Sequence, residues 1–523
     1  MSAEQWIRAA REQDLREGVP LSARAGKSKV LLVRLGEHIY ACGSECTHYG
    51  APLSEGLLMG HVITCPWHNA RFDVTTGRMI APPALDGLSR HPVKVEGGYV
   101  LVGTGRKPGR PAVRPGDART FVIVGAGAAG NAAAETLRQE GFGGRILLIT
   151  AEPDGPYDRT ALSKDFMAGE TSRKWLPLRR EAFYQELGIE LLTGRRVTGF
   201  DPSARAASFA DGSQVAFDRA LLATGGVPRR PTIPGTDLEG FFVLRSLQNA
   251  EAILAAAAQA QSAVILGAGF LGMEVAASLR SRGIEVHVVA PEPVPLARVF
   301  GEQVGRWLQR LHEEQGVRFR VGSAVAGISG DGRVREVALS DGSRVAADLV
   351  LAGVGITPAV DYLEGTGLLD GGAVPVDGRL QTKAEGTYAA GDIAVVPDRR
   401  TGEPQRVEHW VVAERQGQHA ARAMLGSDAP YDEIPFFWTR HFGTSLKYVG
   451  FAREWDTVAM RGNLDAGSFL AGYYSNGRLK AVSAVGYARE VIALGELLKA
   501  GRSVPPEEIA DESTDLVQLV PRA

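Results

Sequence analysis

The chain has 523 residues, of which 44% are hydrophobic and 23% charged, and its formal net charge is −2. That length allows three or four domains, and the balanced charge argues against electrostatic binding to nucleic acid or to a membrane surface. Three cysteines are too few for a disulfide framework, and the charged N-terminal stretch has no apolar core of a signal peptide. We therefore expect a cytoplasmic protein.

Residues 20–105 alternate apolar and polar side chains between frequent Gly and Pro, which predicts a small antiparallel β domain. Within it, Cys46 and His48 form a Cys-x-His pair, and Cys65 and His68 form a Cys-x-x-His pair. Two thiolates and two imidazoles can hold a Rieske [2Fe–2S] cluster, with cysteines on one iron and histidines on the other. A structural zinc site is the alternative, although zinc fingers usually pair cysteine with cysteine and histidine with histidine.

The stretches CTHYGAPL and CPWHNARFDVTTGR resemble the Rieske ferredoxin family, and the resemblance covers roughly residues 1–105. Members in membrane complexes carry an extra cysteine in each ligand loop, where this chain has Ala51 and Trp67. The resemblance therefore implies a ferredoxin or oxygenase type of domain without a disulfide beside the cluster. Cys42, the remaining cysteine, is expected to be a small buried apolar side chain.

A Gly-, Pro- and Arg-rich linker is predicted at 106–118, and alternating strand and helix patterns typical of parallel sheets follow it. Two GxGxxG motifs each lie between an apolar strand and a helix, where glycines let the backbone approach a pyrophosphate. Either motif alone fits a glycine turn of another α/β protein, but two in one chain indicate one flavin site and one nicotinamide site. Their glycines are Gly125, Gly127, Gly130, Gly267, Gly269 and Gly272.

The chain from about 120 to 523 resembles the FAD-dependent pyridine nucleotide reductases of the ferredoxin-reductase and apoptosis-inducing-factor type. Besides both glycine motifs, the resemblance is carried by YDR and LSK (157–164), ATGG (223–226), GVG (353–355), YAAGDIA (388–394), EHW (408–410) and FW (437–438). It implies a multidomain protein with two Rossmann-like α/β nucleotide-binding domains, as in glutathione reductase, and a C-terminal α+β domain. The predicted domains are 1–105 (all-β Rieske), 119–242 with 376–428 (FAD-binding), 243–375 (NAD(P)H-binding) and 429–523 (C-terminal).

The resemblance also implies roles for side chains at the flavin. Asp392 is expected to hydrogen-bond the FAD ribitol, and Arg159 and Lys164 to lie along the pyrophosphate and flavin. Lys164 would sit near flavin N5 and face Glu274 in a partly desolvated charge pair that places the nicotinamide. Two unrelated surface charges are the alternative for that pair. Further expected cofactor contacts are Thr224, Gly225, Gly355, Gly391, Glu408, His409 and Trp410.

Three positions bear on the neighbourhood of the flavin and on nucleotide choice. Trp438 is expected near the flavin, or else as a core aromatic of the C-terminal domain. Glu152 ends the strand after the first glycine motif and is expected at the adenosine ribose. The corresponding strand of the second motif ends at Ala290, with Glu292 two residues later and Arg298 as the nearest arginine that follows. NADH is therefore favoured over NADPH, which is not excluded.

The flavin half contains no cysteine, so disulfide reductase chemistry is excluded and its electrons need another acceptor. We predict an NADH-dependent FAD oxidoreductase that passes electrons to its fused Rieske cluster and on to a protein such as an oxygenase component. The cluster histidines are expected to be the exposed exit. One alternative is an apoptosis-inducing-factor-like NADH oxidoreductase with a sensory or structural cluster, and another is a redox-responsive interaction protein. A homodimer is left open.

Overall fold

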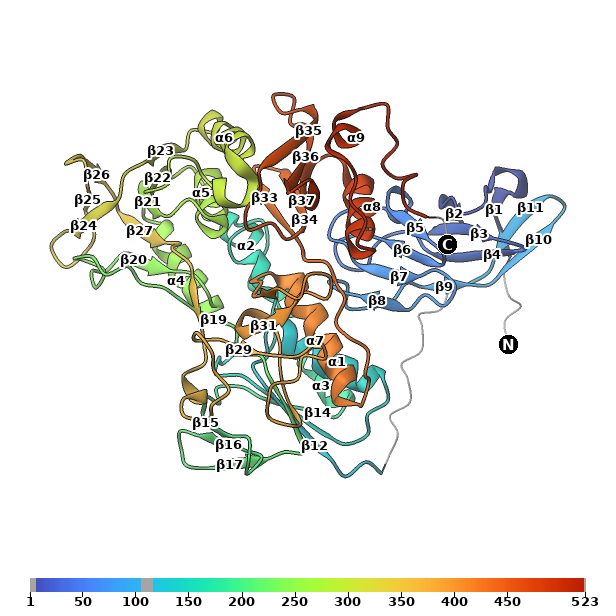
Figure 1. The fold of residues 1–523 in the computed structure, drawn as a ribbon, viewed down its shortest axis with the longest axis horizontal. Helices are drawn as coiled ribbons and strands as arrows, with labels where there is room; N and C mark the ends of the chain where they lie inside the picture. The colour runs from blue at the N-terminus through green and yellow to red at the C-terminus, as the bar shows by residue number, and fades with distance from the viewer. Residues whose placement is uncertain (1–5, 105–115, 522–523) are drawn as a thin grey trace.

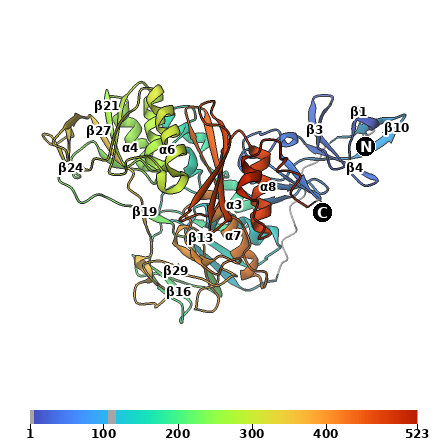
Figure 2. The same cartoon turned by 45° about the horizontal axis from the view of Figure 1, so that its top comes forward.

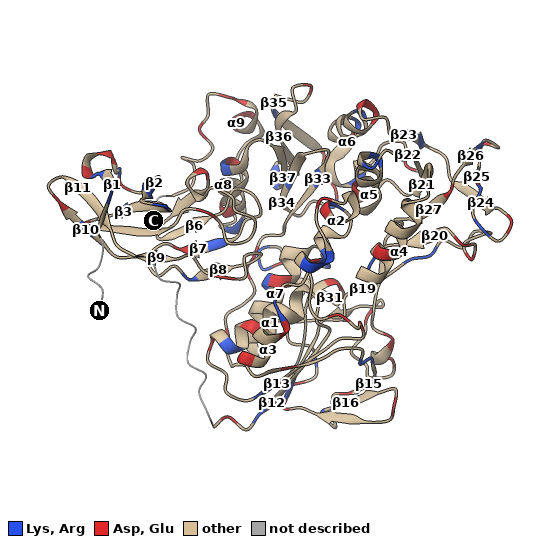
Figure 3. Cartoon of the chain, turned by 180° about the vertical axis from the view of Figure 1, so that it is seen from behind, with Lys and Arg blue, Asp and Glu red and all other residues tan. Residues whose placement is uncertain are grey.

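The computed structural model describes residues 6–104 and 116–521, so most of the predicted linker lies outside the described residues. Figure 1 shows the N-terminal β domain at one end, the second nucleotide-binding domain at the other end, the first nucleotide-binding domain below, and the C-terminal sheet in between. Figure 3 shows basic and acidic residues intermingled over every domain, in agreement with the balanced net charge. Among the described residues, no helix is long and apolar enough to cross a membrane.

The N-terminal domain consists of small antiparallel sheets, which confirms the predicted all-β class. Alternate residues of its central strand face two different cores: Leu31 and Val33 pack beside the cysteines, whereas Val30 and Leu32 pack on the other side. One sheet contains β2 (Leu21–Ala25), β3 (Ser28–Leu35), β4 (His38–Gly43) and β9 (Arg90–His91). The second contains β5 (Leu57–Met59), β6 (Val62–Thr64), β7 (Arg71–Asp73) and β8 (Met79–Ala81), and the third β1 (Ile7–Arg11), β11 (Tyr99–Val102) and β10 (Val93–Glu96).

Two five-stranded parallel sheets follow, each built around one glycine motif. The first has the order β14 (Ile189–Leu192), β13 (Arg145–Ile149), β12 (Thr120–Val124), β18 (Arg219–Leu222) and β30 (Thr387–Ala389). The second has the order β20 (Phe241–Val243), β27 (Leu349–Ala352), β21 (Ser262–Leu266), β22 (Glu285–Ala290) and β23 (Arg318–Val321). The helices after the motifs are α1 (Ala128–Gln139) and α5 (Phe270–Ser281), and α7 (Trp410–Met424) packs along α1.

Smaller elements complete and join these two domains. Strand β19 (Gly226–Pro228) pairs with β28 (Ile356–Pro358) where the chain crosses between them. Each domain also carries a three-stranded antiparallel sheet: β15 (Val197–Asp201), β16 (Ala206–Phe209) and β17 (Gln214–Ala216), and β24 (Val325–Ser329), β25 (Glu336–Leu339) and β26 (Arg344–Ala346). The remaining helices are α2 (Asp165–Ala168), α3 (Glu181–Glu186), α4 (Leu247–Ala257) and α6 (Ala297–Glu314), and a third small sheet contains β29 (Val374–Pro375), β31 (Ala394–Pro397) and β32 (Pro404–Gln405).

The C-terminal domain is an antiparallel sheet with two helices, in agreement with the predicted α+β class. The strand order is β33 (Phe436–His441), β34 (Thr444–Gly450), β37 (Arg478–Val485), β36 (Ser468–Ser475) and β35 (Thr457–Asn463). Helices α8 (Ala488–Lys499) and α9 (Pro506–Ala510) follow, and Ile492 and Ala493 of α8 pack against Leu57 of the N-terminal domain. Figure 2 shows this sheet and α8 standing between the second nucleotide-binding domain and the N-terminal domain.

Candidate cofactor site and metal centre

A cleft of ≈ 650 Å³ opens at the carboxyl ends of the first parallel sheet. This edge is where open parallel sheets bind ligands, because the turns after the strands converge there. The structure brings to this cleft most of the side chains expected at the flavin, together with Glu274 from the second nucleotide-binding domain. The predicted residues that line it are Gly125, Gly127, Glu152, Arg159, Lys164, Thr224, Gly225, Glu274, Gly391, Asp392, Glu408, His409 and Trp410.

The first glycine turn fits a dinucleotide because its glycines have no side chains. Side chains at these positions would either clash with the backbone or occupy the space that a pyrophosphate needs. Gly125 has φ +107°, and a Cβ there would lie 2.2 Å from the Ala223 carbonyl oxygen. A Cβ on Gly130 would lie 1.8 Å from the Gly125 carbonyl oxygen. Only glycine at this position therefore lets α1 approach its strand so closely. Gly127 has open space around its Cβ position, so a pyrophosphate can approach the backbone there.

The second glycine turn repeats this geometry. Gly267 has φ +101°, and a Cβ on Gly272 would lie 2.0 Å from the Gly267 carbonyl oxygen. Gly269 is open, and Gly355, with φ +97°, has nothing near its Cβ position. The two turns therefore form two matching dinucleotide cradles, one in each Rossmann-like domain.

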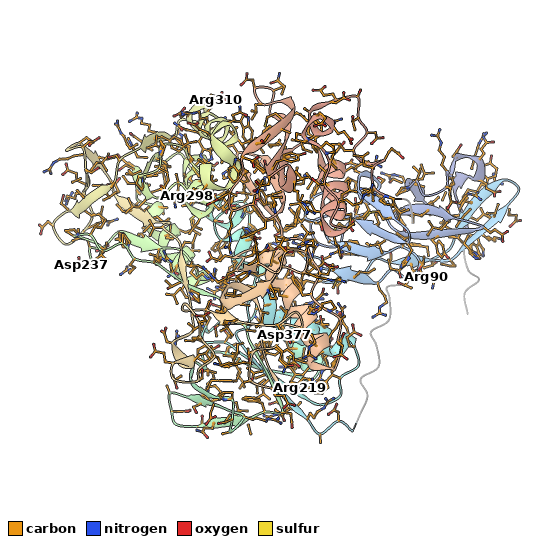
Figure 4. All side chains as sticks on the ribbon, in the orientation of Figure 1. Arg90, Arg219, Asp237, Arg298, Arg310 and Asp377 are labelled. Atoms are coloured by element: carbon orange, nitrogen blue, oxygen red, sulfur yellow. The ribbon has the colours of Figure 1, made fainter. Side chains whose placement is uncertain are left out.

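A carboxylate follows the strand after each glycine motif: Glu152 after β13 and Glu292 after β22. Glu152 accepts hydrogen bonds from the Tyr157 hydroxyl (2.6 Å) and from Arg159 (2.5 Å), and Arg159 also lines the cleft. In the second domain, Glu292 lies 3.8 Å from Arg298, whose side chain is 87% exposed (Figure 4). This arginine is both exposed and close to Glu292, so its position does not decide between NADH and NADPH. The preference for NADH stays a prediction.

A buried charge pair lies where the two nucleotide-binding domains meet. Lys164 Nζ is 2.8 Å from Glu274 Oε2, and both side chains are largely buried. The Glu274 carboxylate also accepts hydrogen bonds from the hydroxyls of Ser163 (2.5 Å) and Thr439 (2.6 Å). Three donors on one buried carboxylate fix its position, as a buried ion pair requires.

The hydrogen-bonded chain continues from Glu274 into the interior. The Thr439 hydroxyl donates to Glu274, so it accepts from His441 Nε2, which lies 2.9 Å away. His441 Nδ1 then faces His312 Nε2 at 3.2 Å. Burial lowers the pKa of His441 to about 3, which keeps both imidazoles of this pair neutral at physiological pH. The network therefore orients Glu274 without adding charge.

Aromatic side chains and a second ion pair form the rest of the cleft wall. The His409 ring stacks on Phe437 with centroids 4.1 Å apart, and Phe270 packs edge-on against Phe437. Burial lowers the pKa of His409 to about 4, so the imidazole is neutral. Asp392 is held by Arg245 at 2.8 Å, a partner that the sequence did not reveal. Such a wall excludes water from a bound ring system.

The four metal-ligand candidates come together as two like pairs. His48 Nδ1 and His68 Nδ1 are 3.0 Å apart, close to the spacing of two nitrogens bound to one metal at about 2.1 Å each. The buried thiols of Cys46 and Cys65 lie beside each other. Burial lowers the pKa of His48 to about 4, although the nearby Asp158 carboxylate acts in the opposite direction and raises it. The imidazole is therefore available as a neutral ligand.

This two-and-two arrangement discriminates between the two metal hypotheses. No group of three or more His, Cys, Asp or Glu side chains that could hold one ion is found within residues 6–104 and 116–521. A mononuclear zinc site needs four ligands around one ion, whereas a Rieske cluster takes two per iron. The donor set therefore fits a Rieske cluster.

The histidine side of the candidate cluster faces the reductase part of the chain. The His68 ring packs against Trp438 of β33 with centroids 4.1 Å apart, and the Tyr49 hydroxyl donates to Asp158 at 2.9 Å. His48 and His68 are each partly exposed, and the ring of His68 meets protein where it packs on Trp438. Trp438 therefore contacts a proposed cluster ligand, and its expected place near the flavin stays a prediction.

Polar contacts on three sides hold the N-terminal domain in this position. Glu433 lies between Arg71 of the N-terminal domain, Arg415 of α7 and Lys499 of α8. Arg415 also donates to the carbonyl of Asn69, the residue after His68, at 2.7 Å. Neighbouring cations lower the pKa of Glu433 to about 2 despite its burial, so this carboxylate links three domains while ionised.

Family models match nearly the whole chain. The model described as pyridine nucleotide-disulphide oxidoreductase matches residues 119–417, the Rieske [2Fe–2S] domain residues 5–92, and the reductase C-terminal domain residues 436–520. Apoptosis-inducing factor 3 of Mus musculus is 36% identical over 514 residues, which cover 95% of this chain and 84% of that protein.

Two further relatives match the reductase part. The ferredoxin–NAD(+) reductase subunit of the benzene 1,2-dioxygenase system of Pseudomonas putida is 34% identical over 404 residues, 77% of this chain and 98% of its own. The crystal structure of a ferredoxin reductase from Rhodopseudomonas palustris superposes with a TM-score of 0.75 and 34% identity, and covers 77% of this chain and 100% of that one.

Proposed function

Because the chain belongs to the pyridine nucleotide-disulphide oxidoreductase family and carries a Rieske domain, we propose that it moves electrons from NADH through FAD to its own Rieske cluster. It is an oxidoreductase of the ferredoxin–NAD(+) reductase type, and its cofactors are FAD, NAD(H) and a [2Fe–2S] cluster. The step proposed here is the route within one chain, followed by delivery to a protein acceptor such as an oxygenase component.

One observation carries this proposal: adjacent residues of β33 touch the two redox sites. Thr439 donates to Glu274 in the flavin cleft, and the ring of its neighbour Trp438 packs on the proposed ligand His68. Consecutive Cα atoms are about 3.8 Å apart, so the two sites are near each other without sharing a side chain. Because all of these contacts lie in one chain, the proposed route does not need a second subunit.

The chain's own residues supply position and electrostatics. When bound, FAD accepts a hydride and releases single electrons, and the cluster takes one electron at a time. Lys164 and Glu274 are proposed to orient the nicotinamide against the flavin, with Thr439 and Ser163 fixing the carboxylate. The stacked His409 and Phe437 are proposed to keep water out of the cleft.

Anaerobic stopped-flow mixing with one equivalent of NADH tests the route. Flavin bleaching is expected first, followed by the spin-resonance signal of a reduced cluster. Trp438→Leu, which removes the ring on His68, should slow the second phase several-fold and leave the first unchanged. Trp175→Leu, at a 73% exposed side chain, is the matched control. A cluster that stays oxidised while the flavin turns over with an artificial acceptor would contradict the relay and support a structural or sensory cluster.

A further inference from the structure

Lys447 lies on the face of the C-terminal sheet that the Rieske domain covers. It is the residue of β34 directly opposite Trp438 in the antiparallel β33–β34 pair. Directly opposite residues project to the same face of the sheet, with Cβ atoms about 5 Å apart. The Trp438 ring packs on His68, so the Lys447 side chain runs toward the same ligand loop, where the Cys65 thiol also feels its charge.

The charge of Lys447 differs from the two other cations that act on His68. Those cations are Lys164, which is paired with Glu274 at 2.8 Å, and Arg440, which is paired with Asp165 at 2.8 Å. Over residues 6–104 and 116–521, Lys447 has neither an ion pair nor a side-chain hydrogen bond of its own. It is therefore the cation near the cluster ligands whose field is not cancelled by a neighbouring carboxylate.

A largely buried ammonium without a partner is costly, and here burial lowers its pKa. Lys447 lacks a carboxylate partner, and a bound cluster would supply the negative charge near it. A Rieske cluster gains one unit of negative charge on reduction, while its two thiolates and two neutral imidazoles stay in place. A fixed cation in a region of low dielectric stabilises that reduced form.

One charge opposes Lys447 from the other side of the ligand set. Asp158 accepts the hydrogen bond of Tyr49 and acts on His48, where its negative charge disfavours added electron density. Glu433, another carboxylate of the interface, is already shared among two arginines and a lysine. The cluster therefore lies between one uncompensated cation and one carboxylate.

We propose that Lys447 raises the reduction potential of the docked Rieske cluster, so that the cluster becomes a better electron acceptor when its domain rests on the C-terminal sheet. Because coupling is reciprocal, reduction of the cluster tightens the docking of the Rieske domain by the same factor. The inference rests on the ligand set and docked geometry given above, and it does not depend on where the electrons come from or go.

Equilibrium redox titration of the full-length holoprotein with chemical mediators, followed by spin resonance of the cluster, tests this assignment. Lys447→Met should make cluster reduction about tenfold less favourable, which is a midpoint about 59 mV lower. Lys447→Arg should stay near the wild-type midpoint. Lys94→Met, which removes a lysine from the far edge of the Rieske domain, should leave the midpoint unchanged.

A second neutral variant keeps the test decisive if Lys447→Met does not fold. Lys447→Gln should shift the midpoint in the same direction, and Asp158→Asn should shift it the opposite way. A Lys447→Gln midpoint equal to that of Lys447→Arg, in proteins with normal cluster spectra, would overturn the proposal. The mediators deliver electrons directly, so failure of the NADH relay leaves this titration unaffected, and the two outcomes are distinguishable.

Discussion

The two faces of strand β33 present different chemistry. Phe437, Thr439 and His441 lie on the cleft side, where Phe437 stacks on His409 and Thr439 joins His441 to Glu274 by hydrogen bonds. Trp438 and Arg440 face the other way, toward the proposed Rieske ligand His68. The period of two in a β-strand produces this separation. One short strand therefore serves both redox sites, and substitutions on its two faces should affect different reactions.

The largest expected effect is on the Rieske side. His68→Ala removes one of two proposed ligands to the same iron, so the visible and spin-resonance signals of the cluster should disappear. Reduction of FAD by NADH should persist, because the cleft residues are untouched. His61→Ala, at an exposed histidine of the same domain, is the control. A normal cluster spectrum in His68→Ala would refute the ligand assignment.

The next effect concerns Glu433, the carboxylate that links the N-terminal domain to the rest of the protein. Glu433 has a pKa of about 2 instead of 4.5, so its contribution to stability is complete above pH 4.5 and is lost as the pH falls toward 2. Glu433→Gln should therefore lower stability by about 3 kcal/mol at pH 7, and the difference from wild type should shrink toward pH 2.

Chemical unfolding monitored at several pH values measures this difference for Glu433. Glu37→Gln, at an exposed side chain, provides the control. A constant difference between Glu433→Gln and wild type across the whole pH range would show that the ionised carboxylate does not hold the domains together.

On the cleft side, Glu274→Gln leaves Lys164 with a neutral partner in a buried position. Misplacement of the nicotinamide should slow FAD reduction by NADH about 100-fold, while the cluster spectrum stays normal. Stopped-flow absorbance measures the rate, and Glu302→Gln, on the exposed face of α6, is the control. An unchanged rate would remove the charge pair from the proposed hydride-transfer site.

The smallest effect comes from the strand itself. Thr439→Val keeps the shape of the side chain but removes its hydrogen bond to Glu274, which should slow hydride transfer about tenfold. Electron arrival at the cluster from chemically reduced flavin should be unaffected, because Trp438 on the opposite face is retained. Thr444→Val in β34 is the control. Equal slowing of both steps would show that the two faces are not independent.

Local patterns made much of this arrangement predictable. The two Cys–His pairs and both glycine turns depend on spacing within a few residues, and Glu152 follows from the strand after its turn. The facing of Lys164 and Glu274, which are far apart in sequence, was implied by family resemblance. The alternation of β33 also predicts that Trp438 and Thr439 point to opposite sides of the sheet.

Contacts between domains were not predictable in the same way. Whether the cluster histidines meet solvent or protein depends on Arg71 meeting Glu433, 362 residues later in the chain, and on Arg415 meeting Asn69. Neither segment carries a local signal for its partner. Lys447 gives a partial signal, because a lysine opposite a tryptophan is unusual in an otherwise apolar pair of strands. The sequence does not show which segment of the chain covers these two side chains.

The covering of the cluster ligands also sets an order of events during synthesis. The ligand loops emerge from the ribosome early, while the surface that covers them, around Glu433 and Trp438, emerges 362 residues or so later. At about 5–20 residues per second, that delay is roughly 20–70 s. During this interval the C-terminal sheet is absent, so the His68 ring lacks its contact with Trp438, whereas Cys46 and Cys65 are buried among residues of the N-terminal domain itself. Docking then packs Trp438 on His68, so this contact between the two redox sites forms only after the C-terminal sheet has been synthesised.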